Sequence, residues 1–213
     1  MNLILFGPPG AGKGTQAQLI VKNFQYFQLS TGDLLRDQIN KNTSMGLEIK
    51  EIIARGSFVS DEIVNPLLVN AINDNKNKPG IIFDGYPRSI IQAENLEQIL
   101  NKENQIIDAT IFLNVNREMI QKRILGRITC DKCNMTLNEF FNQKEIAEHP
   151  CGKDSLKRRV DDNENTVIAR YDTYMEKTKP VLDFYKKKDG FHEIDGSLKI
   201  DEITSKISTI LNV

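Results

Sequence analysis

The sequence contains no tryptophan, two histidines and three cysteines among its 213 residues. So few cysteines cannot build the disulfide framework of a small secreted domain, and a chain of this length can bury a full core without one. No apolar run approaches the length of a membrane span, and the apolar start at residues 1–6 lacks the basic residues of a signal peptide. We therefore expect a soluble, cytoplasmic protein.

An excess of charge of either sign is also missing. The chain carries 28 basic and 29 acidic residues, a formal net charge of −1. Such a balance gives no general attraction for nucleic acid or for an anionic membrane, so we expect neither as a partner. Affinity for phosphate must come from a local arrangement, and the lack of an obvious exposed apolar stripe predicts a monomer.

Apolar periodicity predicts strands that alternate with helices. Strands are expected at 2–6, 81–84, 109–115 and 191–194, and helices at 16–24, 92–100, 118–125, 166–185 with a break at Pro180, and 201–211. This alternation predicts an α/β fold with a parallel sheet flanked by helices. Two short helices at 31–39 and 47–55 form a first insertion. The segment 127–165, without sustained periodicity, forms a second.

A glycine-rich loop follows the first predicted strand. Residues 7–15 read Gly-Pro-Pro-Gly-Ala-Gly-Lys-Gly-Thr and open a predicted helix, the context in which backbone amides and a helix N-terminus surround a phosphate chain. A purely structural turn explains the glycines but not Lys13, which suits the outer phosphates. Gly14 follows where GTP-hydrolysing switch proteins place a Mg²⁺-binding Ser or Thr, which argues against a regulatory switch.

The three cysteines lie in one short stretch. Cys130-x-x-Cys133 and, after 17 intervening residues, Cys151-x-x-Asp154 have the spacing of a tetrahedral zinc site. His149 is an alternative fourth ligand, because imidazole also binds zinc. Four protein ligands leave no open position for a reacting water, so the metal is expected to be structural.

Two carboxylates are candidates for a magnesium site. Asp84 ends the apolar strand at 81–84 and therefore lies at the carboxyl edge of the sheet, where ligands bind in such folds. Asp33 lies in the first turn of a predicted helix, where its charge also suits the macrodipole. We expect both to hold Mg²⁺ through water molecules.

Taken together, the motifs resemble those of the adenylate kinase family. The glycine loop, Ser30-Thr-Gly-Asp33 and Asp84-Gly-Tyr-Pro-Arg88 occur in the family's order and spacing, and the resemblance extends over essentially the whole chain. Further matches are Gly126-Arg127, Arg159-Val-Asp-Asp162, Arg170 and Asp195-Gly196.

The resemblance implies a P-loop kinase that moves a phosphoryl group reversibly from MgATP to AMP, giving two ADP. It implies a core at 1–29, 60–126 and 165–213, a helical AMP-binding insertion at 30–59 and a lid at 127–164. It further implies closure of this lid over the nucleotides, a motion for which adenylate kinase is itself the usual example. Some family lids carry structural zinc, and the family pattern favours Asp154 over His149.

The resemblance also assigns site residues. The catalytic group comprises Lys13, Arg88, Arg123, Arg127, Arg159 and Arg170. ATP is expected to contact Gly10, Ala11, Gly12, Lys13, Gly14, Thr15, Arg123, Arg127 and Leu198. AMP is expected to contact Thr31, Arg36, the backbone of Ser57, Phe58 and Val59, then Gly85, Tyr86, Pro87, Arg88, Gln92, Arg159 and Arg170.

Arginine usage supports this assignment. The sequence has nine arginines against 19 lysines, yet six arginines fall at resembled phosphate-binding positions. A guanidinium binds two phosphate oxygens at once, as phosphoryl transfer requires, and no general base is needed because the AMP phosphate is already ionised. The Gln92 amide can donate and accept, which suits the adenine edge. A UMP or CMP kinase and, from a different class, a zinc-ribbon nucleic-acid module are the alternatives.

Overall fold

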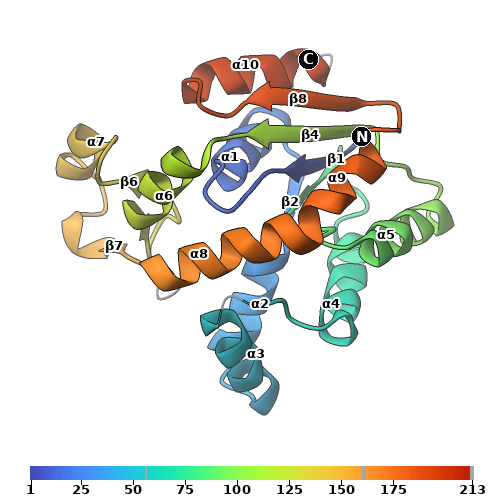
Figure 1. The fold of residues 1–213 in the computed structure, drawn as a ribbon, viewed down its shortest axis with the longest axis horizontal. Helices are drawn as coiled ribbons and strands as arrows, with labels where there is room; N and C mark the ends of the chain where they lie inside the picture. The colour runs from blue at the N-terminus through green and yellow to red at the C-terminus, as the bar shows by residue number, and fades with distance from the viewer. Residues whose placement is uncertain (56, 160–161, 212–213) are drawn as a thin grey trace.

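The computed structural model describes residues 1–55, 57–159 and 162–211. Within these ranges a five-stranded parallel sheet in the order β2-β3-β1-β4-β8 forms the centre of the molecule, with helices on both faces (Figure 1). This arrangement confirms the predicted α/β class. The strands are β1 (Asn2–Phe6), β2 (Phe27–Ser30), β3 (Ile81–Asp84), β4 (Ala109–Asn114) and β8 (Phe191–Asp195).

Strand β1 explains why the sheet is buried on both faces. It lies between β3 and β4, with Leu3 in register with Ile82 and Ala109. Leu3 and Leu5 pack into one apolar cluster, whereas Ile4 and Phe6 pack into the other. Because successive side chains point to opposite faces, this continuous apolar run supplies both layers of the core.

Each layer is completed by helices whose apolar residues meet the sheet. One layer contains residues of α1 (Lys13–Phe24), α6 (Arg117–Leu125) and α10 (Ile200–Ile210). The other contains residues of α4 (Asp61–Asp74), α5 (Ile90–Lys102) and α9 (Lys179–Tyr185). Side-chain hydrogen bonds cap the amino ends of several helices. At the start of α6, the Asn116 side chain accepts a hydrogen bond from the Met119 amide at 2.9 Å.

The first insertion forms the two helices that the sequence predicts, α2 (Thr31–Asn40) and α3 (Ser44–Ala54). Ser30 and Thr43 cap them, accepting from backbone amides three residues later. Gly46 lets the helices approach closely, because a Cβ there would lie 2.4 Å from the carbonyl oxygen of Gln38.

The second insertion contains secondary structure that the sequence analysis does not predict. Its three-stranded antiparallel sheet, in the order β6-β5-β7 among the described residues, lies beyond the carboxyl ends of the main strands (Figure 1). These strands are too short to show a period of two. The elements are β5 (Arg127–Cys130), β6 (Thr136–Asn138), α7 (Gln143–Ala147), η1 (Lys153–Ser155) and β7 (Leu156–Lys157).

Three further differences separate the structure from the sequence prediction. Strand β2 and helix α4 are not predicted. The helical stretch after the lid runs from α8 (Glu164–Thr173) through the π-helical turn η2 (Tyr174–Thr178) into α9. Pro180 falls in the first turn of α9, where its missing amide proton is tolerated, so the irregular turn precedes it. No helix in the described ranges has the length and apolar character needed to cross a membrane.

Candidate active site

The site lies where the strand order reverses direction. From β1 the chain continues to β2 and β3 on one side and later to β4 and β8 on the other. Ligands in open parallel sheets bind outside the carboxyl ends of the strands at such a point. The arrowheads of β1, β4 and β8 point toward the side on which the lid lies (Figure 1). The glycine-rich loop follows β1 directly and occupies this position.

The loop is closed by its own lysine. Nζ of Lys13 donates to the carbonyl oxygens of Gly7, at 2.8 Å, and Pro8, at 3.1 Å. Gly12 begins helix α1 with a φ of 99°, a left-handed conformation that favours glycine. Arg123, from α6, donates from Nη1 to the carbonyl oxygen of Ala11 at 3.2 Å. The loop therefore presents a helix N-terminus and two cations to the same space.

Positive charges from distant segments converge on Lys13. Burial lowers the pKa of its ammonium to about 8; Asp84 opposes this shift, whereas Arg88, Arg170 and Arg127 lower the pKa further. Like charges disfavour one another's ionised form unless an anion joins them. This concentration of cations beside a phosphate-type loop therefore suits a polyanionic ligand.

The two acidic candidates have different surroundings. Asp84 is partly buried and accepts from Nε2 of Gln28 at 3.0 Å, and burial raises its pKa. Its Oδ2 lies 3.7 Å from the position a Cβ would take on Gly14, so the carboxylate adjoins the phosphate loop. Asp33 is mostly exposed and pairs with Arg36 at 2.5 Å. Burial opposes its ionised form, but the Arg36 guanidinium outweighs burial and lowers the pKa of Asp33.

Several residues expected at AMP surround Arg88. Its Nε donates to the carbonyl oxygen of Gly85 at 2.6 Å, and its guanidinium carbon lies 4.9 Å from the centre of the Phe58 ring. The Thr31 hydroxyl donates to the same carbonyl at 3.0 Å. Burial, followed by the charge of Arg170, lowers the pKa of Arg88 to about 10.

The amide of Gln92 is engaged within the protein. Its oxygen accepts from the backbone amide of Arg88 at 2.7 Å, and its nitrogen donates to the Asp61 carboxylate. An amide oxygen can accept two hydrogen bonds and an amide nitrogen can donate two, so these contacts do not by themselves prevent Gln92 from recognising an adenine edge. Asp61, at the start of α4, has no expected role in the sequence analysis.

Asp162 joins two of the expected arginines. Its side chain is 1% exposed and accepts from Arg127 Nε at 2.7 Å and Nη2 at 2.5 Å, while Nη1 of Arg170 lies 3.7 Å away. In the sequence, Asp162 stands out only as the last residue of the Arg159-Val-Asp-Asp162 motif. An acidic residue so near the expected arginines was the signal from which an ion pair with one of them could have been predicted. Residues 160 and 161 of that motif lie outside the described residues. Arg159 acts on the pKa of Asp33, which places its charge toward the first insertion.

The remaining expected residues occupy four segments. Leu198 packs in the core layer of α1 and follows Asp195, whose charge acts on the pKa of Arg123. The turn that follows β8 is therefore close to the glycine-rich loop. Gly10, Ala11 and Thr15 lie in the loop and the first turn of α1, Ser57 and Val59 follow α3, and Tyr86 and Pro87 follow β3.

Comparison with known proteins agrees with this geometry. The model of the family described as adenylate kinase matches residues 5–190. The chain is 62% identical to the adenylate kinase of Pelagibacter ubique (strain HTCC1062) over 213 residues, covering 100% of both chains. It is 43% identical to the adenylate kinase of Erythrobacter litoralis (strain HTCC2594), covering 99% of this chain and 100% of the relative.

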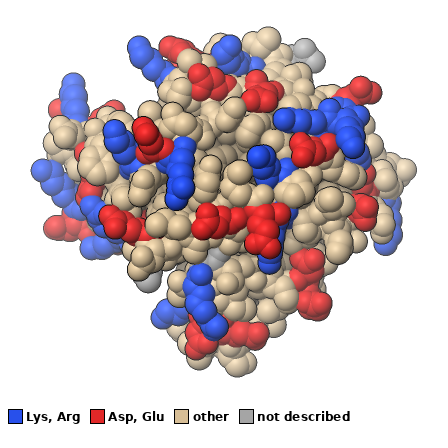
Figure 2. Space-filling model, viewed as in Figure 1, with Lys and Arg blue, Asp and Glu red and all other residues tan. Residues whose placement is uncertain are grey.

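The chain belongs to the adenylate kinase family. Membership confirms the fold class and the enzyme class expected from the sequence, a phosphotransferase that interconverts ATP and AMP with two ADP. The zinc-ribbon alternative loses its support, since the family match extends far beyond the cysteine segment. Figure 2 also argues against a nucleic-acid module, because basic and acidic side chains are interspersed on the face shown.

The second insertion brings together four possible metal ligands. The donor atoms of Cys130, Cys133, His149 and Cys151 lie within 4.8 Å of one another. This group contains His149, the alternative fourth ligand, and not Asp154, the preferred one, which is exposed in η1.

Local backbone geometry explains this difference. Gly152, with a φ of 82°, turns the chain so that its amide donates to the His149 carbonyl at 2.9 Å. His149 is buried, and its Nε2 lies 3.8 Å from the sulfur of Cys133. Burial opposes ionisation of Cys130, but hydrogen bonds with Ser155, His149 and two backbone amides outweigh it and lower the pKa of this thiol. Thiolates and imidazole are the preferred ligands of zinc.

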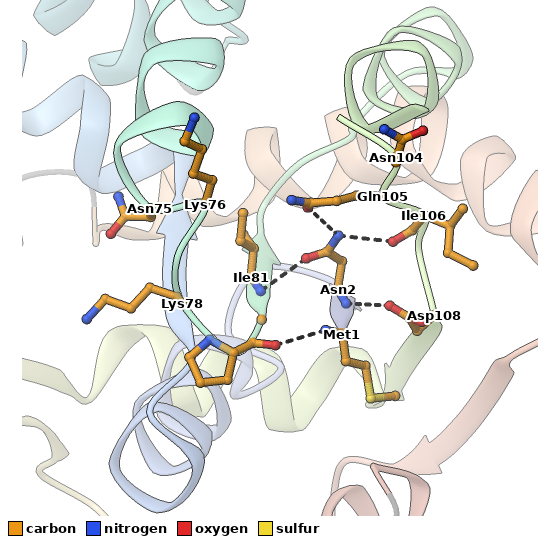
Figure 3. A pocket seen from close by; sticks show the side chains of 12 residues that line it. Met1, Asn2, Asn75, Lys76, Lys78, Ile81, Asn104, Gln105, Ile106 and Asp108 are labelled. Atoms are coloured by element: carbon orange, nitrogen blue, oxygen red, sulfur yellow. Dashed lines mark hydrogen bonds between the residues drawn. The ribbon is translucent and has the colours of Figure 1, made fainter. Parts of the chain in front are cut away.

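A cavity of about 300 Å³ lies at the other edge of the sheet (Figure 3). Its polar groups bind one another. Asn2 donates to the Gln105 side chain at 2.9 Å and to the carbonyl of Ile106 at 3.0 Å, and its oxygen accepts from the Ile81 amide at 3.2 Å. The Asp108 carboxylate accepts from the Asn2 amide at 2.6 Å. These bonds tie strand ends together, which indicates a structural role.

Proposed function

We propose that this adenylate kinase transfers the phosphoryl group between a donor triphosphate on the glycine loop and AMP beside Arg88. The supporting observation is the convergence of charge: Arg88, Arg127 and Arg170, from three separate segments, all act on buried Lys13. An AMP phosphate oxygen attacks the γ-phosphorus, and the bond to the departing ADP oxygen breaks. Charge spreads over the equatorial oxygens of the moving group, where fixed cations stabilise it without a general base.

We propose that the remaining expected residues divide between the two substrates. Arg123 and the Asp195–Leu198 turn lie on the donor side, because Arg123 bonds the glycine loop. Thr31, Arg36, Gly85 and Gln92 lie on the AMP side, around Arg88 or within the first insertion. Arg159, whose charge acts on Asp33, reaches the acceptor from the lid.

Asp84 suits the magnesium ion that accompanies ATP better than Asp33. Its carboxylate adjoins the glycine loop near Gly14, and oxygen ligands are those that Mg²⁺ prefers. Asp33 is occupied by Arg36 and lies at the start of the first insertion. A magnesium ion held there would supply positive charge that offsets the charge of the donor phosphates. Asp84 is therefore expected to contribute more than Asp33 to binding Mg²⁺.

A coupled assay of ADP formation with AMP, UMP, CMP or GMP as acceptor tests the function. Selective turnover of AMP is expected, with Arg88→Ala reducing it by on the order of 100-fold, because one charge-stabilising contact contributes about that factor. Arg55→Ala, at an exposed surface pair, is the matched control and is expected to retain activity. Selective turnover of UMP or CMP instead would make the chain a kinase of another monophosphate.

We also propose that the lid binds one structural zinc ion through Cys130, Cys133, His149 and Cys151. Metal analysis of two variants tests the fourth ligand. Asp154→Ala is expected to retain about one zinc per chain, and His149→Ala is expected to lose most of it. The reverse result would restore Asp154, and a wild-type chain without zinc would remove the metal from the proposal altogether.

The division into core, AMP-binding insertion and lid fits the two segments that leave the main sheet, α2–α3 and β5–β7. The monomeric state and the cytoplasmic location stay predictions. Sedimentation of the purified protein would test the first.

A further inference from the structure

The side chain of Phe58 lies between two cations from other parts of the chain. Phe58 is half-buried in the segment after α3. The guanidinium carbon of Arg88 lies 4.9 Å from the centre of its ring, and Nζ of Lys177 lies 5.9 Å from the same centre. Both distances fall within the range of cation–π attraction. The ring therefore links the first insertion to the loop after β3 and to η2.

Arg88 is held at its backbone and at its Nε by three other residues. Nε donates to the Gly85 carbonyl, and the backbone of Arg88 bonds the side chains of Gln92 and Thr178. The backbone bonds hold the Arg88 main chain and the Nε bond holds one corner of the guanidinium, while the hydrogen bonds among the described residues use neither Nη group. The plane of the guanidinium fork decides whether it meets two phosphate oxygens at once. A ring beneath the guanidinium restricts that plane.

The irregular turn η2 supplies two neighbouring contacts to this arrangement. Thr178 donates to the Arg88 carbonyl at 3.4 Å, and the preceding residue, Lys177, reaches the Phe58 ring. π-Helical turns are rare and often occur at functional sites. Here one such turn touches both members of the Phe58–Arg88 pair.

We propose that Phe58, with Lys177, is a positioning residue that orients Arg88 for the phosphate of the acceptor nucleotide. The inference rests on the proposed role of Arg88 at AMP. It goes beyond the sequence analysis, which expects only the backbone of Phe58 to contact the nucleotide. Lys177 also adds a positive charge at this ring, so its removal weakens both the contact and the local attraction for an anion.

Steady-state kinetics with each substrate varied separately test the inference. Phe58→Leu keeps an apolar side chain but removes the ring, and it is expected to raise KM for AMP three- to tenfold, roughly the value of one cation–π contact. KM for ATP is expected to stay unchanged. Phe58→Trp, which keeps an aromatic face, is expected to restore the wild-type KM. Lys177→Met is expected to raise KM for AMP about twofold, whereas Lys179→Met, at an exposed position two residues away, is the matched control.

A double-mutant cycle separates positioning from general damage to the fold. In an Arg88→Ala background, Phe58→Leu is expected to have no further effect on KM for AMP, because the group it orients is gone. Equal increases in KM for AMP and ATP, or additive effects of the two substitutions, would overturn the inference. If Phe58→Leu lowers the melting temperature, Lys177→Met and Phe58→Trp still carry the test. An Arg88→Ala variant with unchanged KM for AMP would instead contradict the proposed function itself.

Discussion

The amino and carboxyl ends of the parallel strands use polar side chains in opposite ways. At the amino ends, the side chain of Asn2 satisfies Gln105, Ile106 and Ile81 through three hydrogen bonds. At the carboxyl ends of the strands, Lys13 and Arg88 are partly buried among other cations, and the pKa of each is lowered. The first arrangement stabilises the fold, because buried polar groups are paired. The second gives up stability to keep charges ready for a phosphate ligand.

The lowered pKa of Lys13 makes this difference measurable. Its pKa is about 8 in the folded protein against an ordinary value of 10.5. Between these values the unfolded chain binds more protons than the folded one, so stability rises with pH across this window. Below about pH 8 the ammonium is charged in both states, and its burial lowers stability by a constant amount. A bound phosphate reverses the effect by favouring the charged form.

Replacement of Lys13 is expected to have the largest effect. Lys13→Met removes a cation from the transferring phosphates, and kcat is expected to fall on the order of 10³-fold. The melting temperature is expected to stay equal or rise, because a buried charge is lost together with the functional group. Lys22→Met, on an exposed part of the same helix, is the control for both measurements. Near-normal kcat in Lys13→Met would contradict the functional role given to the charges at the carboxyl ends of the strands.

Replacement of Asn2 is expected to show the opposite pattern. Asn2→Ala leaves the buried amide of Ile81 without its acceptor, at an expected cost of about 1–3 kcal/mol in the free energy of unfolding. The value of kcat is expected to be unchanged. Urea denaturation of this variant and of Lys78→Met, an exposed residue of the same cavity, measures the cost. A loss of kcat with intact stability would show that the amino ends of the strands also serve function.

The pH dependence of ATP binding is expected to show the smallest effect. Affinity should be constant below pH 8 and fall by up to about tenfold per pH unit above it, because binding then requires proton uptake by Lys13. Titration calorimetry from pH 7 to pH 9.5 measures this. Lys13→Arg, whose guanidinium stays charged, should give a flat profile. A flat profile in the wild-type protein would contradict the lowered pKa.

The sequence predicted features that depend on neighbours in the chain. The glycine loop at 7–15 combines a strand, four glycines, a lysine and a helix start within one short segment. The strands at 81–84 and 109–115 were visible because burial on both faces requires continuous apolar runs. Strand β2, by contrast, reads Phe-Gln-Leu-Ser and has one fully buried residue, so it lacks the continuous apolar run that marks the other strands.

The Cys/His cluster of the second insertion shows where spacing stops being informative. The positions of Cys130, Cys133 and Cys151 identified the cluster, but the choice between His149 and Asp154 depended on the turn at Gly152. The left-handed φ at this glycine directs the neighbouring side chains, and two residues of spacing cannot reveal it.

By itself the sequence determined the P-loop fold, the phosphoryl-transfer chemistry and most candidate residues, because each rests on a local motif or an apolar pattern. Only the tertiary structure decided which charges meet. Asp162 joins Arg127 across 35 residues, and Phe58 lies 30 residues from Arg88 and 119 from Lys177. Such pairs are set by how helices and loops pack on the sheet, and packing depends on the whole core, whose contacts link residues distant in the chain.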